Sequence, residues 1–379
     1  MDRLEPKREL FDIPSDITYL NCAYMGPLSR PVFEAGRAGL DRKLRPWTIG
    51  PADFFSPVEE ARELFARLIE ADPPGVAILP SVSYGIAVAA QNLPLGTGER
   101  IVTLAEEFPS NVYAWRELAS RQSGEVVAVP RPDDADWTTP LLEHIDDRTA
   151  IVAVPNCHWT DGGLLDLVRV GERAREAGAA LVVDGVQSIG AMPFDVARIR
   201  PDFVVTSLYK WLLGPYSAAF MWCAPQHREG RPLEYSWMTR VGSDDFPHLV
   251  NYQDTYRPGA RRYDVGETSN FALMPAITAS LKQVLEWKVE RIADYIGALT
   301  ASTAASAQAL GLGVAPPHLR AGHLLGVRLH GADPELVAKA MAKANVFVSV
   351  RGDAMRVAPH VYNSPEDIDR LFEVLAATL

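Results

Sequence analysis

An acidic and a basic side chain each follow an apolar segment in a way that can place both in one cavity. The segment Ala180–Val183 is continuously apolar and is followed directly by Asp184. A second apolar segment, Phe203–Thr206, is followed by Ser207 and, three residues later, by Lys210. Parallel strands of an α/β sheet present their carboxyl ends at one edge, where such sheets bind ligands. The sequence therefore predicts that Asp184 and Lys210 face the same site.

An amine and a carboxylate at neighbouring strand ends are the two groups that pyridoxal-phosphate chemistry requires. Lys210 can form a Schiff base, and Asp184 can hold a pyridinium nitrogen in its protonated state. The protonated ring stores the electrons released when a bond at the substrate Cα is broken. The alternative is a capping aspartate and a solvated lysine in unrelated turns, which is disfavoured because both groups occur in order on neighbouring strands.

A phosphate site is expected where an apolar strand passes through two serines into a helix. Ser81, Val82 and Ser83 lie between the apolar run Val76–Leu79 and the helical stretch Ile86–Asn92. Backbone amides at a helix N-terminus, helped by serine hydroxyls, bind a phosphate dianion well. Serine is also the ordinary N-cap residue, so a purely structural role is the alternative.

Bulk composition narrows the range of partners. The chain has 379 residues, with 37 lysines and arginines against 48 aspartates and glutamates, which gives a net charge of −11. This balance argues against nucleic acid or an anionic membrane as the partner. No apolar stretch approaches the roughly 20 residues that cross a bilayer, and the N-terminus lacks a hydrophobic signal core. Cys22, Cys157 and Cys223 show no metal-type spacing, so we expect a cytoplasmic protein without a metal site.

Alternation of apolar and amphipathic segments predicts an α/β fold. Continuously apolar runs separated by helices, such as Asp166–Glu176, are typical of a mostly parallel sheet covered by helices on both faces. Ser56 and Glu59 have the spacing of a capping box, which predicts a helix from Ser56 to about Ile69. The expected strands are Val76–Leu79, Arg100–Leu104, Val126–Val129, Ala150–Val154, Ala180–Val183, Phe203–Thr206 and Ala218–Trp222.

The length predicts a main domain plus a smaller one. We expect residues 51–260 to form the large domain and residues 261–379 to form a long linking helix, Leu273–Leu299, and a smaller α+β C-terminal domain. Residues 1–50 are expected to join that small domain, and the turn-rich residues 226–265 to form a long functional loop. The small domain should contain strands His323–Leu329, Val346–Val350 and Ala354–Ala358 and helices Pro334–Ala344 and Pro365–Ala376.

Taken together, these segments resemble the class V aminotransferases, pyridoxal-phosphate enzymes of the aspartate aminotransferase fold (fold type I). That family includes the cysteine desulfurases, kynureninase and the isopenicillin N epimerase-like enzymes. The resemblance runs from Tyr19 to Ser364, and its most specific parts are the Asp184–Gln187 and Ser207–Lys210 motifs. It implies that Lys210 carries pyridoxal 5′-phosphate and moves protons at Cα, and that Asp184 pairs with the pyridine nitrogen. It also implies that Gln187 lies near the 3-oxygen and that Ser81, the Val82 amide, Ser83 and Ser207 hold the phosphate.

Two further loops match the family in outline. Phe108 stands where the family places an aromatic group against the cofactor ring; desulfurases have histidine there, and phenylalanine can stack but cannot transfer a proton. In the loop that closes over the cofactor's oxygen face, Asn156, His158 and Thr160 are the candidates for contact, and the choice among them stays open.

A third loop implies a shared active site. Residues Tyr263–Asn270 resemble the family's loop that reaches a cofactor phosphate across a dimer interface. Thr268 would then complete the site of the partner subunit, and the protein would be an obligatory homodimer.

The substrate is expected to be a small amino acid. Arg356 matches the family's small-domain arginine that grips the α-carboxylate, for which a planar guanidinium is well suited. Arg351 is the competitor for this role, and a surface salt bridge is the structural alternative. Asn21, in a turn expected to approach the active site, is a further candidate for substrate binding.

Transamination is the favoured reaction; a C–S or C–C lyase and an amino-acid epimerase are the alternatives, because all three need Lys210 and Asp184. A sensing or scaffold role is disfavoured, since the chain has no DNA-binding appendage. Tyr209, where desulfurases have histidine, favours the epimerase-like and kynureninase branches. A cysteine desulfurase is disfavoured because residues Val348–Asp353, where that enzyme carries its nucleophile, contain no cysteine. Cys22 is the one plausible substitute.

Overall fold

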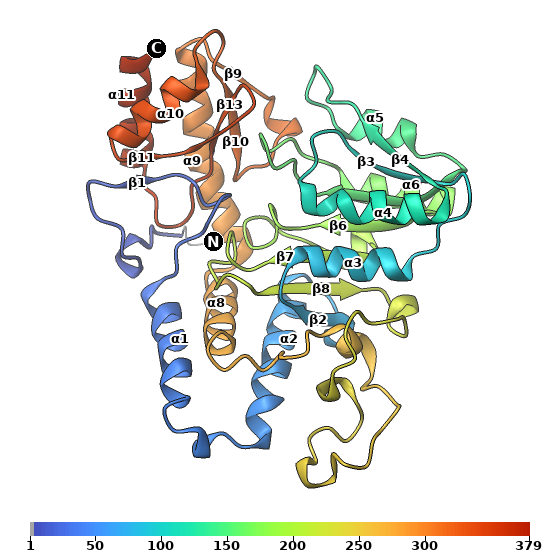
Figure 1. The fold of residues 1–379 in the computed structure, drawn as a ribbon. Coiled ribbons are helices and arrows are strands. Elements are labelled where there is room, and N and C mark those ends of the chain that lie inside the picture. Colours follow the sequence, from blue (N-terminus) through green and yellow to red (C-terminus); the bar gives the residue numbers. More distant parts are fainter. Residues whose placement is uncertain (1–3) are drawn as a thin grey trace.

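The core of the computed structural model, which describes residues 4–379, is a seven-stranded sheet (Figure 1). All neighbouring strands are parallel except β8, which runs antiparallel to both β2 and β7. The mostly parallel sheet predicted from the apolar runs is thus confirmed. In spatial order the strands are β2 (Val76–Leu79), β8 (Ala219–Cys223), β7 (Phe203–Ser207), β6 (Ala180–Asp184), β5 (Thr149–Pro155), β3 (Arg100–Leu104) and β4 (Glu125–Val129).

Helices cover both faces of this sheet, and the strands are apolar on both sides for that reason. In β5, for example, Ala153 packs into one core while Val152 and Val154 pack into the core on the other face. One face carries α3 (Val82–Asn92) and α4 (Tyr113–Gln122). The other carries α2 (Ser56–Leu68), α5 (Thr138–His144), α6 (Leu167–Ala177), the short α7 (Val196–Ile199) and α8 (Met274–Trp287).

A smaller α+β unit lies beside the carboxyl ends of the large sheet (Figure 1). Its antiparallel sheet has the order β12 (Ser349–Arg351), β13 (Ala354–Val357), β10 (Leu325–Arg328) and β9 (Gly313–Val314). Its helices are α9 (Val289–Ala309), α10 (Pro334–Lys343) and α11 (Pro365–Thr378). This is the smaller C-terminal domain that the sequence predicts.

The N-terminal segment contacts both parts of the molecule. Its strand β1 (Thr18–Tyr19) pairs in parallel with β11 (Val346–Phe347) of the small unit. The following helix α1 (Arg30–Arg42) packs instead against α8, and Gly39 lies so close to the Phe271 carbonyl that a Cβ atom would approach its oxygen to 2.3 Å. Within residues 4–50, the segment around β1 thus contacts the small unit, and α1 contacts the large one.

Three local predictions are wrong. The expected linking helix Leu273–Leu299 is two helices, α8 and α9, broken at Lys288, whose φ of 66° no helix accommodates. The expected strand Val346–Val350 is divided between β11 and β12, which belong to different sheets. Ser56 is the first residue of α2 and not its N-cap: Glu59 N donates to the Phe55 carbonyl at 2.9 Å, and the Glu59 side chain binds Arg261 (2.9 and 2.5 Å).

Short 3₁₀ turns supply much of the remaining structure. Residues 226–265, expected as a long loop, hold no helix or strand longer than such turns. The 3₁₀ turns are Arg8–Leu10, Pro46–Thr48, Pro51–Phe54, Pro73–Gly75, Pro109–Asn111, Pro225–His227, Trp237–Thr239, Phe246–His248, Gly259–Tyr263 and Pro317–Leu319.

Within residues 4–379, no helix combines the length and apolar content needed to cross a membrane.

A buried ion pair fixes the edge strand β2 to the end of the long loop of residues 226–265. Arg62 of α2 is fully buried, and its Nη2 lies 2.7 Å from Asp264 Oδ2. The other oxygen of Asp264 accepts a hydrogen bond from Ile78 N at 2.8 Å, and Arg62 Nη1 donates to the Val76 carbonyl. The pair thereby joins α2, β2 and the start of the loop that contains Thr268.

Replacing Arg62 should destabilise the protein, because it leaves the Asp264 carboxylate buried without its partner. We expect Arg62→Met to lower the free energy of unfolding by about 3–5 kcal/mol, the usual cost of breaking a buried pair from one side. Arg37→Met, which breaks the exposed pair with Glu34, should leave stability nearly unchanged. Urea-unfolding midpoints of the two variants measure the difference, and equal midpoints would contradict the assignment.

Candidate functional site

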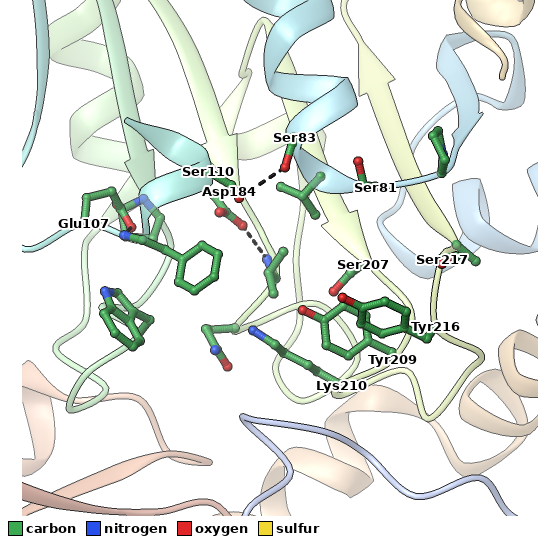
Figure 2. A pocket seen from close by; sticks show the side chains of 18 of the residues that line it. Ser81, Ser83, Glu107, Ser110, Asp184, Ser207, Tyr209, Lys210, Tyr216 and Ser217 are labelled. Atoms are coloured by element: carbon green, nitrogen blue, oxygen red, sulfur yellow. Dashed lines mark hydrogen bonds between the residues drawn. The ribbon is translucent and has the colours of Figure 1, made fainter. Parts of the chain in front are cut away.

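A cavity of about 260 Å³ opens at the carboxyl ends of β5, β6 and β7, next to the N-terminus of α3 (Figure 2). Its wall combines hydroxyls, two carboxyls, one amine and aromatic rings. The residues that line it are Pro80, Ser81, Val82, Ser83, Glu107, Phe108, Ser110, Pro155, Cys157, Trp159, Asp184, Val186, Gln187, Ser207, Tyr209, Lys210, Tyr216, Ser217 and Ala218.

Asp184 and Lys210 face this cavity from adjacent strands, as the sequence predicts. Asp184 ends β6 and is paired in register with Val205 of β7, and Lys210 lies three residues beyond the end of β7. The two side chains form no direct ion pair. Asp184 Oδ1 accepts a hydrogen bond from Val186 N at 2.9 Å, and this fixes the carboxylate while its second oxygen remains available.

Burial sets the protonation of both groups. Removal from water lowers the pKa of the Lys210 amine from 10.5 to about 8, a shift that the negative charge of Asp184 partly opposes. Burial also raises the pKa of Asp184, which Val186 N and the charge of Lys210 counteract. Lys210 Nζ lies 5.5 Å from the ring centroids of both Phe108 and Tyr209. A minor fraction of the amine is therefore neutral and nucleophilic near neutral pH, and this fraction is far larger than for an ordinary lysine.

A close backbone contact holds the lysine turn in place. Gly26 N donates to the Tyr209 carbonyl at 2.8 Å. A Cβ atom at Gly26 would lie 2.2 Å from the Lys210 carbonyl oxygen, so only glycine permits this approach. The N-terminal segment thus packs directly on the backbone of Lys210.

The serines expected to hold a phosphate gather on one side of the cavity (Figure 2). Ser81 is the N-cap of α3 and accepts a hydrogen bond from Tyr84 N at 3.2 Å, while the Ser83 and Ser110 hydroxyls lie 3.1 Å apart. Ser207 Oγ is buried and has no partner among residues 4–379. An unpartnered hydroxyl beside a helix N-terminus fits a phosphate group, since each phosphate oxygen accepts hydrogen bonds.

An aromatic wall encloses another side of the cavity. The rings of Phe108 and Trp159 meet edge to face, with centroids 5.5 Å apart. Trp159 Nε1 donates to the Glu106 carbonyl at 2.7 Å, which fixes the indole. Phe108 thus lies on the wall, where the sequence places an aromatic group against the cofactor ring.

Gln187 lines the cavity, but its amide is largely engaged elsewhere. Its Nε2 donates to the Ala23 carbonyl at 3.1 Å, and its Oε1 accepts from Trp211 Nε1 at 2.9 Å. The side chain is therefore rigid, and its expected position near the cofactor's 3-oxygen stays a prediction.

Asn156, His158 and Thr160 do not lie on the cavity wall, so the expected contact with the cofactor gains no support from the structure. His158 is fully buried, stacked on Trp137, and bonded to Thr160 Oγ1 at 2.7 Å and to the Ala105 carbonyl at 3.1 Å. The loop bends at Asn156 and turns tightly after His158, where Gly162 N donates to the His158 carbonyl at 2.9 Å. Cys157 and Trp159, not their neighbours, line the cavity.

The two residues expected to bind substrate also lie behind the wall. Arg356 is only 1% exposed, and its Nη1 donates to the Trp159 carbonyl at 2.6 Å. Burial lowers its pKa to about 9. Asn21 Oδ1 accepts a hydrogen bond from Ser349 Oγ at 2.8 Å. Thr268, expected to serve the partner subunit, lies outside this cavity and donates to the Val265 carbonyl.

Several wall residues were not expected from the sequence. Glu107 is 7% exposed; its Oε1 accepts from Phe108 N at 2.6 Å, and its Oε2 has no partner among the described residues. Burial, together with the charge of Asp184, raises the pKa of Glu107 to about 8. Cys157 and Trp159 belong to the loop that the sequence placed near the cofactor, but its turn made the lining members unpredictable. Tyr216 and Ser217 lie in the turn before β8, and no motif marks them.

A lysine and an aspartate at adjacent strand ends, facing serines at a helix N-terminus, define a pyridoxal-phosphate enzyme of fold type I. The profile of the class V aminotransferases matches residues 51–371, and the chain belongs to this family. It is 28% identical to the uncharacterized aminotransferase YcbU of Bacillus subtilis, over 98% of this chain and 97% of that protein. It is 27% identical to the isopenicillin N epimerase of Streptomyces clavuligerus, over 95% and 94% of the two chains.

The fold has close relatives among solved structures. An apo cysteine desulfurase from Thermococcus onnurineus NA1 superimposes with a TM-score of 0.85, covering 100% of this chain and 99% of the other at 19% sequence identity. At this level of identity the likeness concerns the fold.

Membership of the family makes pyridoxal 5′-phosphate the cofactor, and the residues present fit it. Lys210 supplies the amine, Asp184 a free carboxylate oxygen, and Ser207 an unpartnered hydroxyl. When bound, this cofactor withdraws electrons from the substrate Cα.

The lowered pKa of Lys210 predicts how the cofactor-free protein reacts with pyridoxal phosphate. The reaction rate, followed by visible absorbance, should rise with pH through a midpoint near 8. Asp184→Asn should move the midpoint to lower pH, because the charge that raises the lysine pKa is gone. Asp369→Asn, an exposed control far from the cavity, should not move it. A midpoint near the ordinary lysine value, or no shift in Asp184→Asn, would show that the two charges do not interact.

Proposed function

We propose that this enzyme is an aminotransferase acting at Cα of a small amino acid. The observation that carries the proposal is the pairing of one buried amine of lowered pKa, Lys210, with a phenylalanine on the wall. Transamination needs one base that removes a proton from Cα and delivers it to the cofactor's C4′ carbon on the same side. Phe108 cannot transfer a proton, and we assign both steps to Lys210. The full-length similarity to an aminotransferase supports the same reaction.

The other residues then have distinct roles in this proposal. Asp184 keeps the pyridine nitrogen protonated, and Ser81, Ser83 and Ser207 bind the phosphate together with the amide of Val82. Arg356 binds the α-carboxylate of the substrate. Its support is a buried guanidinium that has no carboxylate partner among residues 4–379 and whose Nε has no hydrogen bond there.

An epimerase is the second candidate, and Glu107 favours it. Epimerisation needs a second proton carrier besides Lys210, and a carboxyl with a pKa near 8 on the cavity wall can hold or release a proton. The similarity to an isopenicillin N epimerase also supports this reaction. A C–S or C–C lyase would use the same Lys210 and Asp184.

Cysteine desulfurase activity remains disfavoured. Cys22 is fully buried, its Sγ lies 3.6 Å from the Lys210 carbonyl oxygen, and burial raises its pKa to about 12. Persulfide formation requires a thiolate, which this environment opposes. Cys157 and Cys223 are also buried and free, which supports a reducing, cytoplasmic location.

Product analysis with an amino-acid panel, with and without a 2-oxo acid acceptor, tests the proposal. We expect a 2-oxo acid product that depends on the acceptor and is still formed after Cys22, Cys157 and Cys223 are replaced by alanine. A product of inverted configuration that is lost in Glu107→Gln would identify an epimerase. Pyruvate with sulfide and no need for an acceptor would identify a lyase. Alanine from cysteine, with a persulfide trapped on Cys22, would identify a desulfurase.

We also propose a homodimer in which Thr268 completes the partner's site. Four large apolar side chains on and after α1 are exposed in the single chain: Phe33, Leu40, Leu44 and Trp47, with exposed fractions from 54% to 79%. Such a cluster is typical of a protein–protein interface. Because α1 packs beside Phe271, this surface adjoins the loop of Thr268.

Mixing two impaired variants distinguishes shared from self-contained sites. Thr268→Ala and Lys210→Ala should each be impaired alone. If Thr268 reaches across, a hybrid dimer has one site with both lesions and one intact site, so random exchange restores about a quarter of the sites. Activity should therefore rise on mixing. No rise, after mass spectrometry has demonstrated subunit exchange, would show that each site is built within one chain.

A further inference from the structure

Two arginines of one hairpin contact the same residue of the cavity wall. In the antiparallel pair β12–β13, Ser349 lies opposite Arg356, and Arg351 is two residues beyond Ser349. Opposed residues, and residues two apart on a strand, share one face of a sheet. Arg351 and Arg356 therefore point to the same side, toward Trp159. Arg356 binds its carbonyl, and the Arg351 guanidinium lies over its ring, 5.6 Å from the centroid.

These two guanidinium groups lack opposing acids. Among residues 4–379 neither forms an ion pair; the hydrogen bonds of Arg351 and Arg356 go to the Val350 and Trp159 carbonyls. The charge of Arg351 lowers the pKa of Arg356, and both charges lower that of Lys210. Lys210 on the cavity wall and the two arginines behind Trp159 thus repel one another, an arrangement that bound anions would relieve.

We propose that Arg351 binds a second acidic group of the substrate, so that the enzyme acts on amino acids with a side-chain carboxylate. This inference rests on the proposed function, in which Arg356 takes the α-carboxylate. Arg356 is almost fully buried, whereas Arg351 is partly exposed, so Arg351 suits a group farther from Cα. The Trp159 ring lines the cavity and offers an apolar surface to the methylene groups between two carboxylates.

Acidic amino acids and their amides are matched probes for this role. L-Aspartate and L-asparagine, like L-glutamate and L-glutamine, have nearly the same size and differ in the side-chain charge. Binding to the holoenzyme is measured by the change in cofactor absorbance. Calorimetry with glutarate and butyrate repeats the comparison without an amino group. We expect the holoenzyme to bind at least one acid about 10-fold or more tighter than its amide, as charge-assisted hydrogen bonds predict.

Substitution of Arg351 assigns the preference to this residue. Arg351→Gln should weaken binding of the acid by about 10- to 100-fold and leave the amide within about 3-fold. Arg351→Lys should retain part of the preference, because a point charge replaces the planar fork. Arg328→Gln is the matched control: it makes the same charge change in the same small sheet, where Arg328 pairs with the exposed Asp353.

Two results would overturn the inference. Equal binding of acid and amide by the unmodified holoenzyme would show that no second acidic group is recognised. Equal losses for acid and amide in Arg351→Gln would assign Arg351 to the α-carboxylate. The proposed function fails separately: acid selectivity that depends on Arg351, combined with no acceptor-dependent product, would retain this site and reject the aminotransferase.

Discussion

The structure depends on two opposite charges that are buried together but kept apart. Asp184 and Lys210 leave water at adjacent strand ends without forming a direct ion pair. Burial of separated charges is unfavourable, and it persists because the surroundings fix both groups. The register of β6 and β7 sets the strand ends, Val186 N holds the carboxylate, and Gly26 packs on the lysine turn. An aromatic ring with a basic nitrogen, placed between the two groups, can interact with both the Asp184 carboxylate and the Lys210 amine.

Trp159 connects this charged pair to the small domain. Its ring closes the wall with Phe108, while its carbonyl and its ring face receive Arg356 and Arg351 from the β12–β13 hairpin. Trp159 thus contacts Phe108, which is expected to stack on the cofactor, and strands β12 and β13, whose arginines are expected to bind the substrate. A change in the small domain can therefore reach the cofactor cavity through Trp159, and also through His323, which binds the backbone carbonyl of Gln187.

The sequence predicted most reliably the strands of the large sheet, which helices cover on both faces. Continuously apolar runs predicted all seven strands of the large sheet, and the polar residues directly after them predicted Asp184 and Lys210. The sequence did not predict local backbone geometry that depends on contacts with residues far apart in the chain. The direction of the side chains in the loop of His158 depends on how that loop leaves β5, and the helix break at Lys288 has no glycine or proline to mark it. The role of Thr268 depends on a second chain and stays a prediction.

The N-terminal segment connects the small domain with the turn that carries Lys210 and with helix α8 of the large domain. Leu20 exchanges hydrogen bonds with Phe347 and Ala358 of the small domain, and six residues later Gly26 binds the backbone next to Lys210. Helix α1 then anchors the same segment to α8 of the large domain. Six residues of chain therefore separate the backbone bonds of Leu20 to the small domain from the hydrogen bond of Gly26 to the turn of Lys210. A displacement of the small domain relative to the large sheet would be transmitted along this segment to the turn that carries Lys210.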